Sequence, residues 1–218
     1  MIKAIRNALK VKDIRERILF TLLCLAVVRL GSQLPIPGID RSRISEFLNQ
    51  ITQLSFLNAI TGGSFEQLSI FALSITPYIT SSIIMQLLTI AIPRLEEIQK
   101  EGEEGRKKIG AATRYVTVAL ALIESIAMAI GFGRSGYLEN YSVLSVVVIT
   151  LTLTAGSAFL MWIGEKITDK GVGNGISIIL LVNIVSRMPS DIINLFKTYV
   201  VGGTTVINKV IAAILIVA

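Results

Sequence analysis

The stretch LSIFALSITPYITSSIIMQLLTI (residues 68–90) is apolar enough to enter a membrane, yet it is too polar for a helix surrounded by lipid. Pro77 has no backbone N–H, so a helix has to kink or begin there. Irregular backbone at membrane depth is tolerated only inside protein or beside water. The stretch therefore predicts either a pore-lining helix or a tightly packed interior helix with small interhelical contacts. Nine of the 23 residues are polar or disfavour a helix: Ser69, Ser74, Thr76, Pro77, Thr80, Ser81, Ser82, Gln86 and Thr89.

The composition of the whole chain also indicates a membrane protein. The 218 residues are 52% hydrophobic, the mean hydropathy is +0.70, and the apolar residues gather in long runs with few charges, which is typical of membrane spans. The sequence has no histidine and one cysteine, Cys24. This composition excludes a His/Cys zinc site, a disulfide framework and a Cys–His nucleophile pair within the sequence.

Outward from residues 68–90, the sequence predicts an all-α polytopic bundle. A basic amphipathic helix at 1–17 is expected on the membrane surface. A cleaved signal peptide is the alternative for the N-terminus, but no small-residue cleavage site follows. A turn begins at LPIPGID (34–40), because two prolines and a glycine do not continue a helix. The predicted spans are 18–34, 68–92, 111–131, 143–163 and 176–196, with an external loop at 35–67, a cytoplasmic loop at 93–110, a cytoplasmic hinge loop at 164–175 and a truncated sixth span at 206–218.

The orientation follows from the positive charges. Residues 1–17 and 93–114 hold six Lys or Arg each and residues 164–174 hold two, which places fourteen of the 21 on one side. Cytoplasmic connections carry the excess of Lys and Arg. The N-terminus is therefore predicted to be cytoplasmic.

Several features of the sequence allow two interpretations. Ile75 and Ile79, four residues apart, suit either a plain core or a hydrophobic constriction that blocks ions by dewetting. Glu124 lies inside the third span and is either part of a proton relay or a protonated or hydrogen-bonded carboxyl group that faces the bundle. The charged stretch 96–110 is either a solvated loop or a docking surface with Arg106, Lys107 and Lys108 as its positive patch.

Two further segments have a preferred interpretation. The stretch LSFLNAI (54–60) is too short to cross a bilayer, so it is expected to be interfacial, re-entrant or packed inside protein. The stretch GEKITDKGVGNGIS (164–177) has alternating glycines but lacks the Gly-Lys-Ser/Thr ending of a phosphate-binding loop. A hinge is therefore favoured over nucleotide binding at this stretch.

Four motifs together resemble the SecY family, the central subunit of the bacterial protein-translocation channel. The resemblance covers essentially the whole sequence in colinear order. The motifs are LPIPGID (34–40), ALSITPYITSSIIMQLL (72–88), EIQKEGEEGRKKI with the following TRY (97–109 and 113–115), and FLMWIGEKITDKGVGNGISIILL (159–181).

The resemblance implies a clamshell of ten transmembrane helices in two inverted halves, of which this sequence is the first half and the start of the sixth helix. Spans two and three would form one wall of a lateral gate. The family's apolar pore ring maps onto Ile75, Ile79, Ile176 and Leu180, where leucine replaces a common isoleucine at the last position. The implied plug includes Leu54, Phe56, Leu57, Ile60 and Phe65, and the gate helix carries Pro77, Ser81 and Gln86.

The implied activity is a passive channel in the bacterial plasma (inner) membrane, without catalysis and without a cofactor. Signal sequences and unfolded preproteins would be its substrates, and SecE and SecG its companion subunits in the lipid bilayer. SecA or a ribosome would supply the energy and dock near Arg106, Lys107 and Lys108; no nucleic acid would be bound except through the ribosome. The alternatives are a secondary transporter that uses Pro77 and Glu124, and a half that is inert or pairs with itself.

Overall fold

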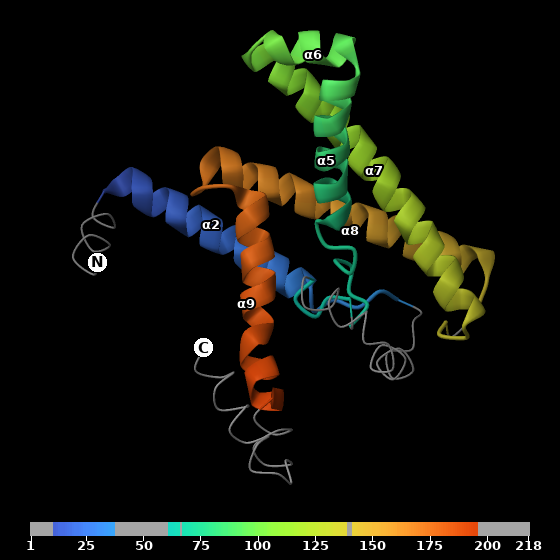
Figure 1. Cartoon of the computed structure of the whole chain (residues 1–218). Coiled ribbons are helices and arrows are strands. Elements are labelled where there is room, and N and C mark those ends of the chain that lie inside the picture. Colours follow the sequence, from blue (N-terminus) through green and yellow to red (C-terminus); the bar gives the residue numbers. More distant parts are fainter. Residues whose placement is uncertain (1–10, 38–60, 66, 139–140, 196–218) are drawn as a thin grey trace, which may run out of the picture.

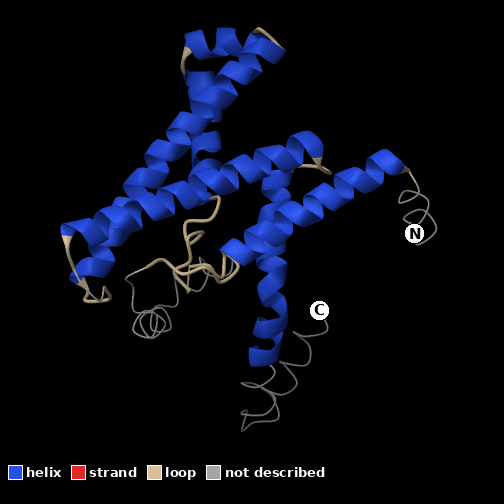
Figure 2. Cartoon of the chain, turned by 180° about the vertical axis from the view of Figure 1, so that it is seen from behind, coloured by secondary structure: helices blue, strands red, loops and turns tan. Residues whose placement is uncertain are grey.

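The computed structural model describes residues 11–37, 61–65, 67–138 and 141–195 (Figure 1). These residues form helices joined by turns, and the only strand-like feature among them is a single bridge between Pro35 and Ser69 (Figure 2). The sequence-based prediction of an all-α fold is confirmed. The helices are α2 (Lys12–Gly31), α5 (Thr76–Ala91), α6 (Pro93–Lys100), α7 (Glu103–Arg134), α8 (Val143–Lys170) and α9 (Gly175–Leu195).

The helices form a connected bundle around α8. Helices α5 and α7 run side by side in opposite directions and are joined through α6 (Figure 1). Helix α8 packs on α7, α2 and α9. Within the described residues, α7 and α8 are long and apolar enough to cross a membrane, and α5 with α6 makes a third candidate that is bent by 102°.

The helix bounds differ from the predicted spans where charged residues continue a helix. Residues 12–17, predicted as part of a separate surface helix, are the first turns of α2, because nothing in the sequence breaks the helix before Gly31. The predicted loop 93–110 contains α6 and the start of α7, and the bend before α6 falls at Pro93. Helix α8 continues to Lys170, so the hinge loop between α8 and α9 is confined to residues 171–174. The predicted span 206–218 lies outside the described residues.

The predicted span 68–92 is helical only from Thr76. Pro77 lies in the first turn of α5, where the missing N–H costs nothing. The preceding residues form irregular backbone in which Leu68 and Ser74 have positive φ angles of 41° and 53°. This segment is hydrogen-bonded to the turn that follows α2: the Ile36 N–H donates to the Leu68 carbonyl and the Ile70 N–H to the Leu34 carbonyl, both at 3.0 Å.

Small residues allow this irregular backbone to lie inside the bundle. Gly156 of α8 faces the Ile70 carbonyl, and a Cβ at Gly156 would collide with that oxygen. The Ser157 hydroxyl donates to the Ser74 carbonyl at 3.2 Å. Helix α7 contributes a stripe of small buried residues at four-residue spacing, Thr113, Thr117, Ala121, Ser125, Ala129 and Gly133, which is the pattern of close helix packing in membranes.

Gly156→Ala is expected to destabilise the fold by about 1–3 kcal/mol, because the added methyl group overpacks the contact with Ile70. The change in unfolding free energy is measured in detergent micelles. Gly131→Ala on α7 is the matched control, because no atom lies within 4 Å of its added Cβ; alanine there should be neutral or stabilising by up to about 1 kcal/mol. Equal losses in the two variants would contradict the packing described at Gly156.

Candidate pore site

The four predicted ring residues lie in one apolar cluster. Ile75, at the start of α5, is 1% exposed, and Ile79, Ile176 and Leu180 are half-buried against the same cluster. The structure therefore brings together two pairs that are about 100 residues apart in sequence. The rest of the buried cluster comes from α2, α8, α9 and the segment before α5: Cys24, Val28, Phe71, Leu160, Ile163, Ile167 and Ile179.

The start of α9 is held in place by its own cap and by α8. The Asn174 side-chain oxygen accepts the N–H groups of Ile176 at 3.1 Å and Ser177 at 3.3 Å, as an N-cap residue does. The Gly175 N–H donates to the Thr168 hydroxyl at 2.9 Å. Gly175 also lies so close to the Gly164 carbonyl that a side chain would not fit. These contacts fix where Ile176 enters the cluster.

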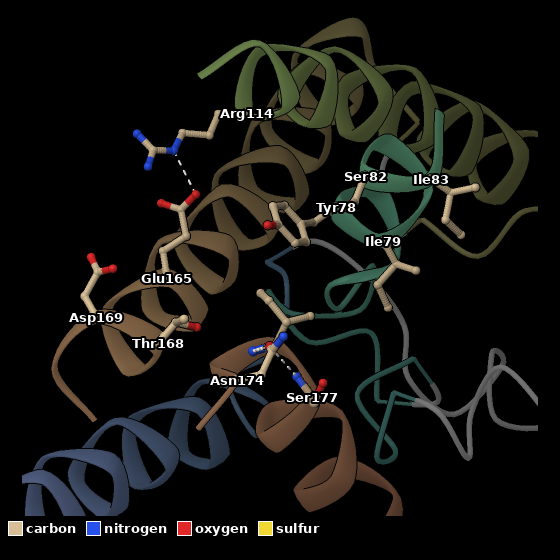
Figure 3. Close-up of a pocket in the computed structure, with 11 residues that line it drawn as sticks. Tyr78, Ile79, Ser82, Ile83, Arg114, Glu165, Thr168, Asp169, Asn174 and Ser177 are labelled. Carbon is tan, nitrogen blue, oxygen red and sulfur yellow. Dashed lines mark hydrogen bonds and ion pairs between the residues drawn. The ribbon is translucent and has the colours of Figure 1, made fainter. Parts of the chain in front are cut away.

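A cavity of about 360 Å³ opens beside the ring residues. Ile79 and Ile176 contribute apolar surface to it, and α7 and α8 contribute the Arg114–Glu165 ion pair, whose Nε and Oε1 atoms are 2.7 Å apart (Figure 3). The cavity thus combines a polar wall with an apolar side, which suits water on one side of a hydrophobic constriction. Its other lining residues are Tyr78, Ser82, Ile83, Thr168, Asp169, Asn174 and Ser177.

The predicted gate residues do not share one face of α5. Pro77 and Ser81 are buried, and Met85 and Thr89 continue the same side. The Ser81 hydroxyl has no hydrogen-bond partner among the described residues. Gln86 is exposed and donates to the Ser82 hydroxyl at 3.5 Å. Gln86 therefore lies on a different side of the helix from the other two.

Most of the predicted plug falls outside the described residues. Leu54, Phe56, Leu57 and Ile60 belong to this part. Phe65 is half-buried and packs against a second apolar cluster, which includes Leu68 and Ala72, and not against the ring cluster. The plug stays a prediction.

The predicted partner surface lies on the first two turns of α7. Arg106, Lys107 and Lys108 are all exposed. The Lys108 ammonium group forms an ion pair with Glu101 at 2.8 Å, and this hydrogen bond raises the pKa of Lys108 above its usual value. Arg106 and Lys107 line a surface cavity together with Arg114, whose own guanidinium group is paired with Glu165.

Glu124 lies half-buried on α7 beside an apolar cavity of about 320 Å³. Among the described residues, the carboxyl group of Glu124 has no ion pair or hydrogen bond, so of the two predicted bundle-facing forms the hydrogen-bonded one is not seen. Sequence reasoning missed two other polar contacts of the bundle: the Arg114–Glu165 pair, and Asn183 of α9, whose side-chain amide donates to the Ser74 hydroxyl at 3.4 Å. The sequence offered one signal for these contacts: each involves a polar residue near the end of a predicted span or inside one.

Comparisons with known proteins point to one family. A family model described as SecY matches residues 69–218. The protein translocase subunit SecY of Halalkalibacterium halodurans is 43% identical over 223 residues, which cover all of this chain and 52% of that protein. The Bacillus subtilis protein of the same name is 44% identical over 224 residues with the same coverage. The chain thus spans about half the length of the curated relatives it matches.

Solved structures show the same fold at lower sequence identity. Sec61 in the canine ribosome–channel complex from the endoplasmic reticulum matches with a TM-score of 0.55 at 19% identity, over 86% of this chain and 38% of that one. A structure described as that of a protein conducting channel matches with the same values. The family match and the curated relatives establish that this chain belongs to the SecY family.

Proposed function

We propose that this chain is the N-terminal half of a protein-conducting channel subunit that passes unfolded secretory polypeptides across the bacterial plasma membrane and releases signal sequences or membrane segments sideways into the lipid. The observation that carries the proposal is the clustering of Ile75, Ile79, Ile176 and Leu180 beside a polar cavity. An apolar constriction excludes ions by dewetting, while apolar side chains still make room for an extended polypeptide.

The chain itself is assigned no catalytic step, so a partner has to supply the energy. The ATPase SecA or a translating ribosome fits this role, with Arg106 and Lys107 as exposed cationic contacts on α7. SecE and SecG are proposed as the companion subunits. The excess of Lys and Arg in residues 1–17 and 93–114 supports a cytoplasmic N-terminus, which would place the polar cavity on the cytoplasmic side of the ring.

The proposal is tested in vesicles that hold the complete channel, with this chain joined to the remaining half and to SecE and SecG. A secretory precursor should enter the vesicles only when SecA and ATP are present, and the same precursor without its signal sequence should not enter. Precursor entry that does not depend on SecA would contradict the proposal. Small-solute uptake that is driven by a proton gradient and lost in Glu124→Gln would indicate a secondary transporter. This second candidate is favoured by the Glu124 carboxyl group, which has no partner within the part of the chain that the structure describes.

A further inference from the structure

An apolar groove between α2 and α8 shares no residue with the cavity beside the ring. Its volume is about 360 Å³. Cys24 and Ile163 of its lining are buried, whereas Leu23 and Val27 of α2 are exposed. The groove is therefore open to its surroundings, and hydrocarbon covers nearly all of it except at two lysines of α8.

An aromatic ladder forms the α8 wall of the groove. Trp162 stacks on Phe159 with ring centroids 5.9 Å apart, and Phe159 stacks on the buried Phe71 at 6.1 Å. Trp162 is 51% exposed, and its indole N–H has no acceptor in the part of the chain that the structure describes. An exposed tryptophan that is anchored in this way suits the boundary between acyl chains and headgroups.

The two lysines make one end of the groove cationic. Lys166 and Lys170 follow Trp162 at intervals of four residues, which places all three on one side of the helix. Neither ammonium group forms an ion pair within the described residues. The nearby Glu165 and Asp169 line the ring cavity instead (Figure 3). Two positive charges thus border the groove without an acidic residue of the chain in its lining.

The cationic end lies at headgroup depth. Both lysines follow the predicted apolar span 143–163, so their ammonium groups can reach the membrane surface. The Val172 N–H donates to the Thr21 hydroxyl of α2 at 3.1 Å, which places the end of α8 beside the turn of α2 that follows the basic residues 12–17. This is the side predicted to be cytoplasmic.

We propose that the groove binds one anionic phospholipid, with an acyl chain along Leu23, Val27 and Trp162 and the phosphate between Lys166 and Lys170. A ligand with a long apolar part and one anionic end matches the lining, and basic pockets between membrane helices suit anionic headgroups. An apolar helix of a partner would cover the hydrocarbon but leave both ammonium groups without a counter-charge. The site does not depend on the proposed channel function.

Quenching of Trp162 fluorescence by brominated lipids tests the site in the complete channel. Trp162 is the single tryptophan of the sequence, so the signal that is lost in Trp162→Phe isolates it from tryptophans of the other half and the companion subunits. Dibrominated phosphatidylglycerol should bind at this position at least about tenfold more tightly than dibrominated phosphatidylcholine, because each lysine beside an anionic headgroup contributes about fivefold. The preference should disappear in Lys166→Gln/Lys170→Gln.

The matched control removes two positive charges elsewhere on the same predicted side. Arg94 and Lys100 of α6 are exposed and lie outside the groove, so Arg94→Gln/Lys100→Gln should keep the preference. A preference that survives the α8 variant, or one that is lost equally in the α6 variant, would overturn the proposal. Equal quenching by both lipids in the unaltered channel would show unselective lipid contact, and no quenching by either would show that a partner covers the groove; each result also overturns it.

A phosphatidylglycerol with a photo-reactive acyl chain locates the bound lipid. The label should concentrate on residues 20–27 of α2 and 159–166 of α8. Ile123 of α7 is the reference position, because it is 61% exposed and Leu23 in the groove is 64% exposed. Equal labelling around Ile123 and Leu23 would refute a defined site in the groove.

Discussion

The Ile79→Ser/Ile176→Ser double variant of the complete channel is expected to leak ions at rest about 10- to 100-fold more than the unaltered channel. Both side chains pack against the ring cluster and border the polar cavity. Each is half-buried and therefore contributes about half of the roughly 1.5–3 kcal/mol of a fully buried isoleucine. Losing both lowers the barrier to wetting by about 1.5–3 kcal/mol, and each 1.4 kcal/mol corresponds to a factor of about ten. Conductance across a planar bilayer, without precursor, measures the leak.

The matched control for the ring variant carries the same substitutions on the exposed sides of the same helices. Ile90 of α5 and Leu181 of α9 are exposed and lie outside the ring cluster. Ile90→Ser/Leu181→Ser should leave the resting ion conductance of the channel unchanged. Equal ion conductance in the control and the ring variant, or a ring variant with the conductance of the unaltered channel, would count against the assigned constriction.

Phe71→Ala is expected to lower the free energy of unfolding by about 3–5 kcal/mol, the largest stability loss predicted for a single substitution here. Phe71 is 4% exposed, and its ring contacts Gly31 of α2 and stacks on Phe159 of α8 with centroids 6.1 Å apart. Its removal leaves a void where α2, α8 and the segment before α5 meet. Unfolding by denaturant in detergent micelles measures the loss.

Phe159→Ala is the control for the Phe71 variant, because it removes the other ring of the same stacked pair. Phe159 is 41% exposed, so its loss should cost roughly 1–2 kcal/mol. Equal costs for the two variants would show that Phe71 is not the centre of this junction.

Long apolar runs made the helical parts of the fold predictable. The predicted spans 111–131 and 143–163 lie within α7 and α8, and the described part of 176–196 lies within α9. Hydropathy reports where a helix can cross lipid, and it does not report where the helix ends. The charged residues 103–110 and 164–170 were therefore predicted as parts of loops, although they are helical in the structure.

The segment before α5 could not be predicted from periodicity. Residues 68–75 look like the first turns of a span, yet their backbone follows contacts with distant residues. The Ile36 N–H donates to the Leu68 carbonyl, Gly156 leaves room for the Ile70 carbonyl, and the Ser157 hydroxyl donates to the Ser74 carbonyl. This irregular backbone is buried in protein, which supports the interpretation of residues 68–75 as a packed interior segment. Further along the same predicted span, Ile79 of α5 borders a polar cavity.

The candidate ring shows what the sequence pattern leaves open. The four-residue spacing of Ile75 and Ile79 is more typical of a plain core than of a constriction, and the family resemblance singled out the constriction. The structure adds that Ile176 and Leu180 lie in the same cluster. The ion pair of Arg114 with Glu165 joins residues 51 positions apart, and no local pattern predicts such a pair.

A stalled secretory precursor gives the most direct test of the proposed pore. The precursor is held part-way through the complete channel, and a photo-reactive residue is placed at Ile79 or Ile176 in one set of channels and at Leu144, an exposed residue of α8, in another. The precursor should cross-link at positions 79 and 176 and not at position 144. Cross-links at position 144 with none at 79 and 176 would show that polypeptides do not pass through this apolar ring.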